Sequence, residues 1–236
     1  MCNILLSKKM RVIEMRKAVI ASIILAGISF NPVMGAQMAI WDFGPNAAGY
    51  TTGPNAVSAN LIGTPTLVLS GGTLDPDGKD GVAYTDAAGV FHAVGQSAAW
   101  DDVKISSSPD AKWIVTLNTT GWADISVRFD YKAWNVNTTS FDLSYQINNS
   151  GTWVTMLNDH TIIADKAFHS FSYSMASIDA IENCSSVQLK VSDLDKTGND
   201  QFAFDNYELA GTPIPEPATI LLLGLGIAAV RRNHRK

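Results

Sequence analysis

A turn-rich stretch in the first half of this chain carries aspartates whose spacing suits a bound cation. Asp75, Asp77 and Asp80 stand among glycines and a proline. Calcium takes carboxylate oxygens presented by flexible turns of this composition. The stretch is not an EF-hand loop, because Lys79 takes the third acidic position and no Glu follows at the twelfth. A structural calcium ion and a solvated turn are the two interpretations, and no other cofactor is indicated.

Tryptophan is the second residue type here with a ligand-binding chemistry. An exposed indole ring stacks on the apolar face of a sugar, while a few polar side chains fix the hydroxyl groups. The chain has six Trp residues, and two of them, Trp122 and Trp134, adjoin the loop-like stretches NTTGW and NVNTT. We therefore expect Trp122 and Trp134 to be exposed and to contact a glycan. The competing interpretation is ordinary packing in the core.

Catalytic residues in a recognisable arrangement are missing from the sequence. His92, His160 and His169 are dispersed and form no zinc motif. Glu182 and Glu208 are the only glutamates between residues 37 and 212, and no carboxylate pair has a glycosidase spacing. We expect that the protein is not an enzyme.

The charge of the chain is unevenly distributed. The whole chain has a formal net charge of −5, whereas residues 36–217 hold eight Lys and Arg against 21 Asp and Glu, a balance of −13. An acidic body of this kind repels phosphate backbones, so nucleic acid is excluded as a partner. Cys2 precedes this body, which leaves Cys184 as its one cysteine, without a disulfide partner and expected to be a small buried residue.

The N-terminus has the order of a secretory signal. Basic residues between 8 and 17 precede an apolar run over residues 18–28, and the small residues Gly35 and Ala36 follow. Residues 1–36 are therefore expected to form a signal helix that is cleaved after Ala36. Cleavage after Gly35 or Ala39 and retention as an anchor are the alternatives.

The C-terminus combines a short apolar run with a basic end. Residues 218–230 would make a helix about 20 Å long, against a bilayer core of about 30 Å. The run has no polar face, so it does not suit the surface of a soluble core. Arg231 and Arg232 begin the basic end, and their long side chains can reach the interface of a short membrane helix. We expect membrane contact through this helix.

Alternation of apolar and polar residues predicts strands with one buried face in the body, residues 37–212. The expected strands cover residues 66–69, 82–85, 103–106, 114–117, 125–131, 141–147, 171–175, 187–191 and 201–211. The stretch NNSG before Trp153 predicts a hairpin, and a change of phase predicts a bulge near Asp205-Asn206. The fold class is an all-β, antiparallel β-sandwich that is jelly-roll-like.

The tail resembles a PEP-CTERM sorting signal. Pro215, Glu216 and Pro217 come first, the apolar run follows, and the basic end with Arg231 and Arg232 closes residues 213–236. The resemblance implies an exported protein, anchored transiently in the membrane and processed by an exosortase-type membrane peptidase. Such proteins are typical of bacteria that make exopolysaccharide.

The body is similar to galactose-binding-like jelly-roll domains between residues 125 and 211. The hairpin from Tyr145 to Trp153 and the closing strand with Phe204-Asp205-Asn206-Tyr207 carry this resemblance. Related jelly rolls often hold a structural calcium between the first and last strands. The resemblance therefore adds Asp42 and Asp205 to the candidate calcium ligands.

Together these features predict a non-catalytic protein of the cell surface or extracellular matrix, associated with exopolysaccharide or biofilm. A structural or adhesive matrix subunit that binds protein partners or itself is the alternative. A polysaccharide hydrolase is the third possibility.

Overall fold

The computed structural model describes residues 35–43, 58–75, 79–103, 111–134, 140–194 and 201–215. The chain divides into two compact units, Met1–Met34 and Gly35–Lys236, and all described residues belong to the second. The expected signal helix and C-terminal hydrophobic helix lie outside the described residues. In the part of the chain that is described, no helix has the length and apolar character for a membrane crossing.

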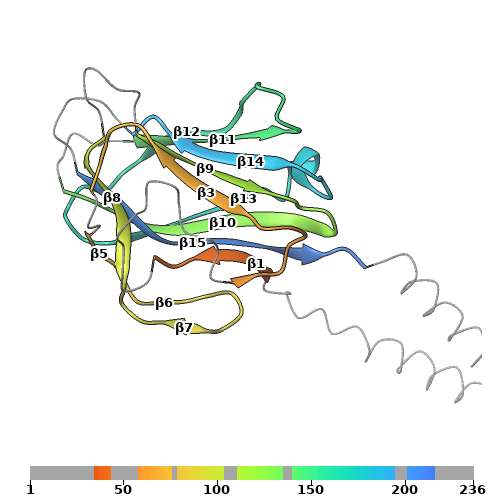
Figure 1. The fold of residues 1–236 in the computed structure, drawn as a ribbon, viewed down its shortest axis with the longest axis horizontal. Coiled ribbons are helices and arrows are strands. Elements are labelled where there is room, and N and C mark those ends of the chain that lie inside the picture. The colour runs from red at the N-terminus through yellow and green to blue at the C-terminus, as the bar shows by residue number, and fades with distance from the viewer. Residues whose placement is uncertain are drawn as a thin grey trace, which may run out of the picture. The chain divides into compact units, whose positions relative to one another are not determined.

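Two antiparallel sheets make up the body (Figure 1). Sheet A runs in the order β13 (His169–Ser174), β10 (Trp122–Ala133), β15 (Phe202–Pro213), β1 (Ala36–Trp41) and β2 (Ser58–Ala59), and it also includes β8 (Gln96–Asp102), β4 (Thr73–Leu74) and β5 (Lys79–Asp80). Sheet B runs in the order β12 (Val154–Thr161), β11 (Ser140–Ile147), β14 (Val187–Ser192), β9 (Lys112–Leu117) and β3 (Thr66–Ser70). A hairpin of β6 (Tyr84–Thr85) and β7 (Phe91–His92) and a 3-10 turn, η2 (Asp179–Ile181), complete the described elements. The predicted antiparallel, jelly-roll-like sandwich is confirmed.

Alternation along the strands produces the two-layer core. In β10, the side chains of Val127, Phe129 and Tyr131 are buried between the sheets, and Arg128 points to the other face. β9 and β14 alternate in the same way, whereas in β11 the outward residues Ser144 and Gln146 are buried as well. Trp113 lies at the centre of the core, with its ring stacked on Phe204 at a centroid distance of 4.2 Å. Aromatic stacking thus joins β9 of sheet B to β15 of sheet A.

Of the strand predicted at residues 103–106, only Val103 belongs to the described residues. Val103 follows β8, which covers Gln96–Asp102, and residues 104–106 lie outside the described part. Ala98 and Ala99 have little strand propensity, so their burial in β8 gave no signal in the sequence. β1 was also not predicted, because its residues 38–41 are all buried and therefore do not alternate.

The predicted bulge in β15 is confirmed. The register passes from the pair Arg128–Glu208 to the pair Asp130–Asp205, so β15 holds one more residue than β10 over this interval. Asn206 takes a positive φ of 51° at the bulge, a conformation that Asn tolerates better than most residues. The bulge lets Phe204 and Tyr207 both face the core.

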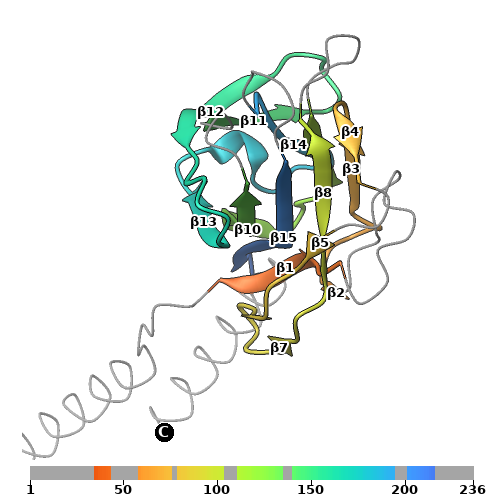
Figure 2. The ribbon, with the colours of Figure 1, turned by 90° about the vertical axis from the view of Figure 1, so that its left-hand side faces the viewer.

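Residues 81–95, the cover segment, lie against the outer side of sheet A, away from sheet B (Figures 1 and 2). His92 bridges two carboxylates there, with Nδ1 3.0 Å from Asp42 Oδ2 and Nε2 3.0 Å from Asp86 Oδ2. The Gln37 side chain donates a further hydrogen bond of 2.7 Å to Asp86. Polar side chains of β1 and of the residue after it therefore hold the β6–β7 hairpin to the sheet.

The bulge supplies the next set of contacts under the cover segment. Backbone N–H groups of Val82 and Asn206 donate to the two carboxylate oxygens of Asp205, at 2.9 and 2.8 Å. A side chain at Gly81 would collide with Asp205, so the glycine permits this close approach. The Ala87 N–H donates a hydrogen bond of 2.8 Å to Glu208 Oε1. Carboxylates that face outward from β15 are consequently buried.

Burial sets the protonation of these groups. Burial raises the pKa of Asp205 to about 7, and the negative charges of Asp130 and Asp42 raise it further. The N–H groups of Val82 and Asn206 act in the opposite direction and only partly offset this rise. Burial alone would lower the pKa of His92, but its hydrogen bonds to Asp86 and Asp42 outweigh burial and raise that pKa. Burial alone would raise the pKa of Asp86, but the hydrogen bonds from His92 and from the Val90 N–H outweigh burial and lower that pKa.

We expect the stability of the folded protein to be greatest near pH 4 and to fall toward pH 8. Folding favours protonated Asp205, so its contribution is lost as pH rises from about 4 to about 7. The contribution of protonated His92 is lost as pH rises above about 6.5. Ionised Asp86 acts in the opposite direction and is lost only below about pH 4. Because burial raises the pKa of Asp205 from 3.8 to about 7, the decline should amount to on the order of 4 kcal/mol.

Urea unfolding of the full chain between pH 4 and pH 8 measures this profile. Asp205→Asn should flatten the decline between pH 4 and pH 7. Asp124→Asn is the matched control, because Asp124 is exposed and has a positive φ that Asn tolerates. A profile of Asp205→Asn that runs parallel to the wild type would contradict the assignment.

Candidate functional site

Trp122, one of the two expected glycan contacts, is buried. Its exposure is 8%, and it belongs to the core cluster between the sheets. The expected exposure of Trp122 is therefore wrong, and its ring has no open face for a sugar.

Trp134, the other expected glycan contact, is half-buried at the end of β10. The Lys132 ammonium lies 4.7 Å from the centroid of its ring and 5.5 Å from the ring of Phe168. This geometry is a cation–π arrangement at a partly exposed position. A glycan contact at Trp134 stays a prediction.

The aspartates expected to bind calcium have donors from within the chain. Asp75 forms an ion pair with Lys79, which also lies 3.3 Å from Asp101. Asp80 is exposed in β5, and Asp77 lies outside the described residues. Asp42 and Asp205 each face the cover segment through the contacts given above. Calcium at these five positions stays a prediction.

The sorting residues are described only in part. Ala36, the expected cleavage position, opens β1 and pairs with Gly211. Pro215 is exposed just after β15, while Glu216, Pro217, Arg231 and Arg232 lie outside the described residues. Cleavage after Ala36 would leave the remaining pairs of β1 with β15 in place.

The outer face of sheet B brings together residues that sequence reasoning did not connect. The pairs Gln146–Gln188, Gln188–Thr116 and Thr116–Thr66 align these side chains across β11, β14, β9 and β3. Trp153 directly precedes Val154, whose partner Tyr145 is the neighbour of Gln146 in β11. We name Trp153, Gln146, Gln188, Thr116 and Thr66 the sheet B row. Its four strand residues cross β11, β14, β9 and β3, or roughly 14 Å at about 4.8 Å per strand, and Trp153 stands just before β12.

Side-chain hydrogen bonds link the middle of the sheet B row. The Gln146 amide donates to Gln188 Oε1, and the Gln188 amide donates 3.0 Å to Thr116 Oγ1. The side-chain oxygen of Gln146, Oε1, is buried and accepts no hydrogen bond from the described residues. An unsatisfied buried acceptor costs about 1–3 kcal/mol. The row thus contains fixed amides and one acceptor with spare capacity.

Trp153 closes one end of the sheet B row. Its ring is half-buried, and the Lys190 ammonium lies 4.5 Å from the ring centroid. Lys190 pairs with Ser144 in the next row, so its side chain reaches across β11 to the indole. Ser144 and Gln146 beneath it are only 4% and 8% exposed. Trp153 and the Lys190 stem therefore cover the polar groups of β11.

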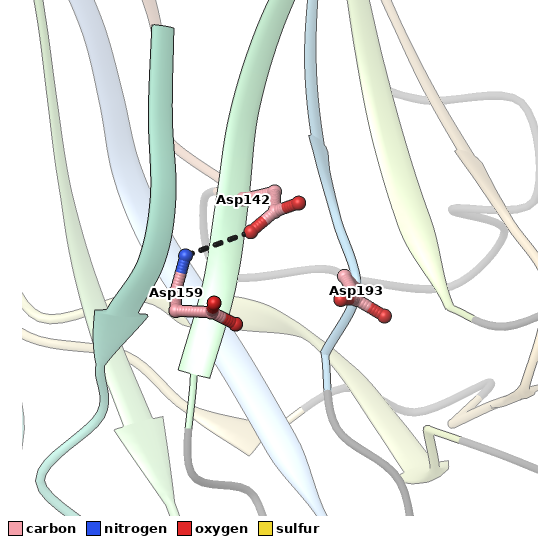
Figure 3. Close-up of side chains that lie close together, drawn as sticks. All are labelled: Asp142, Asp159 and Asp193. Carbon is pink, nitrogen blue, oxygen red and sulfur yellow. Dashed lines mark hydrogen bonds between the residues drawn. The ribbon is translucent and has the colours of Figure 1, made fainter. Parts of the chain in front are cut away.

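Three carboxylates gather at the other end of the same face. Asp142 of β11, Asp159 of β12 and Asp193 after β14 bring one oxygen each within 4.8 Å of one another (Figure 3). The Asp159 N–H donates 2.9 Å to Asp142 Oδ1. Oxygen ligands of this kind suit a hard divalent cation. Asp195 and Asp200, which follow Asp193 closely in the sequence, lie outside the described residues.

A family comparison identifies the tail. Residues 213–236 match the PEP-CTERM protein-sorting motif. The chain carries a PEP-CTERM sorting motif. The protein is therefore exported and sorted at the membrane, where an exosortase-type peptidase processes such tails.

Comparisons over the whole chain are less specific than the match of its PEP-CTERM tail. No curated protein matches it in sequence. Among solved structures, the xylan-binding CBM22-2 domain of Paenibacillus barcinonensis Xyn10C is 11% identical, with coverage of 73% of this chain and 98% of that chain and a TM-score of 0.39. The TmCBM61 structure with β-1,4-galactotriose is 8% identical, with coverage of 61% and 88% and a TM-score of 0.37.

A third solved structure contains more than one module. The Clostridium thermocellum xylanase 10B structure, with CBM22-1 and GH10 modules and xylohexaose, is 11% identical and has a TM-score of 0.43. Coverage is 77% of the PEP-CTERM chain but only 30% of that chain. All three likenesses are remote in sequence and in structure.

We expect Asp142→Asn to stabilise the PEP-CTERM protein in the presence of EDTA. The substitution removes one of three mutually repelling charges and keeps an oxygen that can accept from Asp159. Two charges about 5 Å apart in water repel by slightly under 1 kcal/mol, so the gain should be about 0.5–1 kcal/mol. Urea unfolding at pH 7 measures it.

Asp124→Asn serves as the control, since Asp124 is exposed and lies outside the three-carboxylate group. A loss of stability in Asp142→Asn would show that repulsion does not dominate there. Urea unfolding of the wild type with calcium chloride in place of EDTA tests the separate prediction that the protein binds calcium, because a bound ion would raise the stability of the folded protein.

Proposed function

We propose that the exported sandwich is a non-catalytic polysaccharide-binding domain of the cell surface or extracellular matrix. Its binding face is the outer side of sheet B, and the extracellular polysaccharide of the native cells is its ligand. The observation that carries the proposal is the sheet B row, which sets a partly exposed indole beside amides and hydroxyls on neighbouring strands.

The chemistry of the sheet B row fits a sugar chain. A pyranose ring presents an apolar C–H face and a rim of hydroxyl groups. Trp153 offers an aromatic surface for the former, and Gln146, Gln188 and Thr116 offer hydrogen-bond groups for the latter. Because the amides are held by one another, little side-chain entropy is lost when a ligand binds.

The two sides of the sandwich differ in their availability. The cover segment fills the middle of the outer side of sheet A, where His92, Asp205 and Glu208 are bonded to it or within it. On sheet B, the outward residues Thr66 and Val68 of β3 are exposed, and Thr116 and Gln188 are partly exposed. The open polar surface therefore favours sheet B.

We expect Trp153→Ala to weaken binding of the full chain to the native extracellular polysaccharide by at least about tenfold, or 1.4 kcal/mol. The substitution removes the stacking surface but no core residue. Affinity electrophoresis in gels that contain the purified polysaccharide measures the change, and circular dichroism verifies folding.

Trp153→Phe should retain most of the binding, because it keeps an aromatic face. Trp134→Ala tests the competing prediction of a glycan contact at the other half-buried indole, and the present proposal expects this variant to bind normally. The proposal fails if the wild type is not retarded, or if Trp134→Ala alone abolishes retardation. Release of reducing ends from the polysaccharide would contradict the non-catalytic assignment.

Sorting is expected to depend on the PEP triplet and not on the sandwich. Glu216→Ala should leave the fold intact but retain the protein in the inner membrane, because the peptidase no longer recognises its tail. Fractionation of native cells and mass spectrometry of the C-terminus measure this outcome. Normal surface release of Glu216→Ala would show that the triplet is not recognised, and Glu182→Ala is the control for loss of a carboxylate in the body.

A further inference from the structure

Lys190 holds a positive charge at the centre of the proposed binding face without a carboxylate partner. In the described part of the chain, no Asp or Glu oxygen lies within ion-pair distance of its ammonium group. Its contact is with the Trp153 ring, 4.5 Å from the centroid. Since the body has a formal balance of −13, a lysine of this kind is an exception to its surroundings.

The environment of Lys190 disfavours its charge. Burial and the nearby charge of Lys112 lower the pKa of Lys190, and Asp142 only partly opposes them. Lys112 lies on the neighbouring strand β9 and also points outward, as the alternation of that strand shows. Two cations on one face, one of them half-buried, gain from an anionic ligand group.

We infer that the sheet B face binds a polysaccharide that contains uronic acid residues, with Lys190 as the partner of a sugar carboxylate and Trp153 as the stacking surface of the same sugar. This inference rests on the proposed function and names its ligand class. The indole and the ammonium are in contact in the free protein, so both reach one pyranose ring. Movement of Lys190 to the carboxylate also uncovers Gln146, whose carbonyl oxygen lacks a donor.

The test compares acidic polymers with matched neutral ones. The probes are alginate, polygalacturonate and the carboxyl-reduced form of each, which keep the sugar chain and lose the charge. Dissociation constants of the full-length wild type are measured by isothermal titration calorimetry at low and at physiological salt. We expect at least one acidic polymer to bind tenfold or more tightly than its reduced form, with a preference that shrinks as salt rises.

Three variants separate charge from packing. Lys190→Met keeps an apolar stem over Trp153 and should lose the acidic preference while it still binds the reduced polymer. Lys190→Arg keeps the charge and should restore the preference. Lys166→Met, at an exposed position away from the face, should behave as the wild type.

The possible failures are distinguishable. If reduced polymers or the native polysaccharide bind but acidic ones bind no better, or if Lys190→Met keeps the preference, the uronate inference is overturned and the proposed function stands. If no polymer binds, including the native polysaccharide, the proposed function itself fails. Loss of all binding in Trp153→Ala together with loss of only the preference in Lys190→Met supports both.

Discussion

The bulge at Asn206 is the constraint on which the two sides of this sandwich depend. β15 pairs with β10, β1 and β8, so its register fixes most of sheet A. By taking up one extra residue, it directs Phe204 and Tyr207 into the core and Asp205 to the outer side. The cover segment then closes over that outer carboxylate. The same distortion that completes the core therefore removes the middle of sheet A as an open surface, which is why the binding face is proposed on sheet B.

Much of this architecture was predictable because it follows from local pattern. Period-two alternation located β10, β11 and β14, and the stretch NNSG located the hairpin, where Asn148 and Asn149 take positive φ. The sheet B row was not predictable in this way. Gln146, Gln188 and Thr116 are far apart in sequence, and only the register of three strands that are not consecutive in the chain brings them into one line. Pattern fixes the face of each residue but not its neighbour across the sheet.

The tryptophans show the same limit from another direction. Proximity to a loop-like stretch predicted exposure for Trp122 and Trp134, but Trp122 begins a strand whose first residue already faces the core. Trp153 had a comparable signal, since it follows the NNSG hairpin and precedes β12, an edge strand of sheet B. An edge strand has a neighbour on one side only, so its side chains keep part of their surface. Position in the sheet, rather than distance from a loop, decides whether an indole stays available.

Electrostatic range explains how an acidic body can hold an anionic chain. At physiological salt, charges farther apart than about 8 Å are largely screened, so the excess of carboxylates acts weakly at Lys190. Direct contacts dominate there, and the charges of Lys112 and Asp142 are the ones that shift the pKa of Lys190. Asp142 belongs to the group with Asp159 and Asp193 at one end of the face, which would repel an anionic sugar. A polyuronate is therefore guided toward the end of the face near Trp153, where the amides lie, and its position follows from attraction at Lys190 combined with repulsion beyond it.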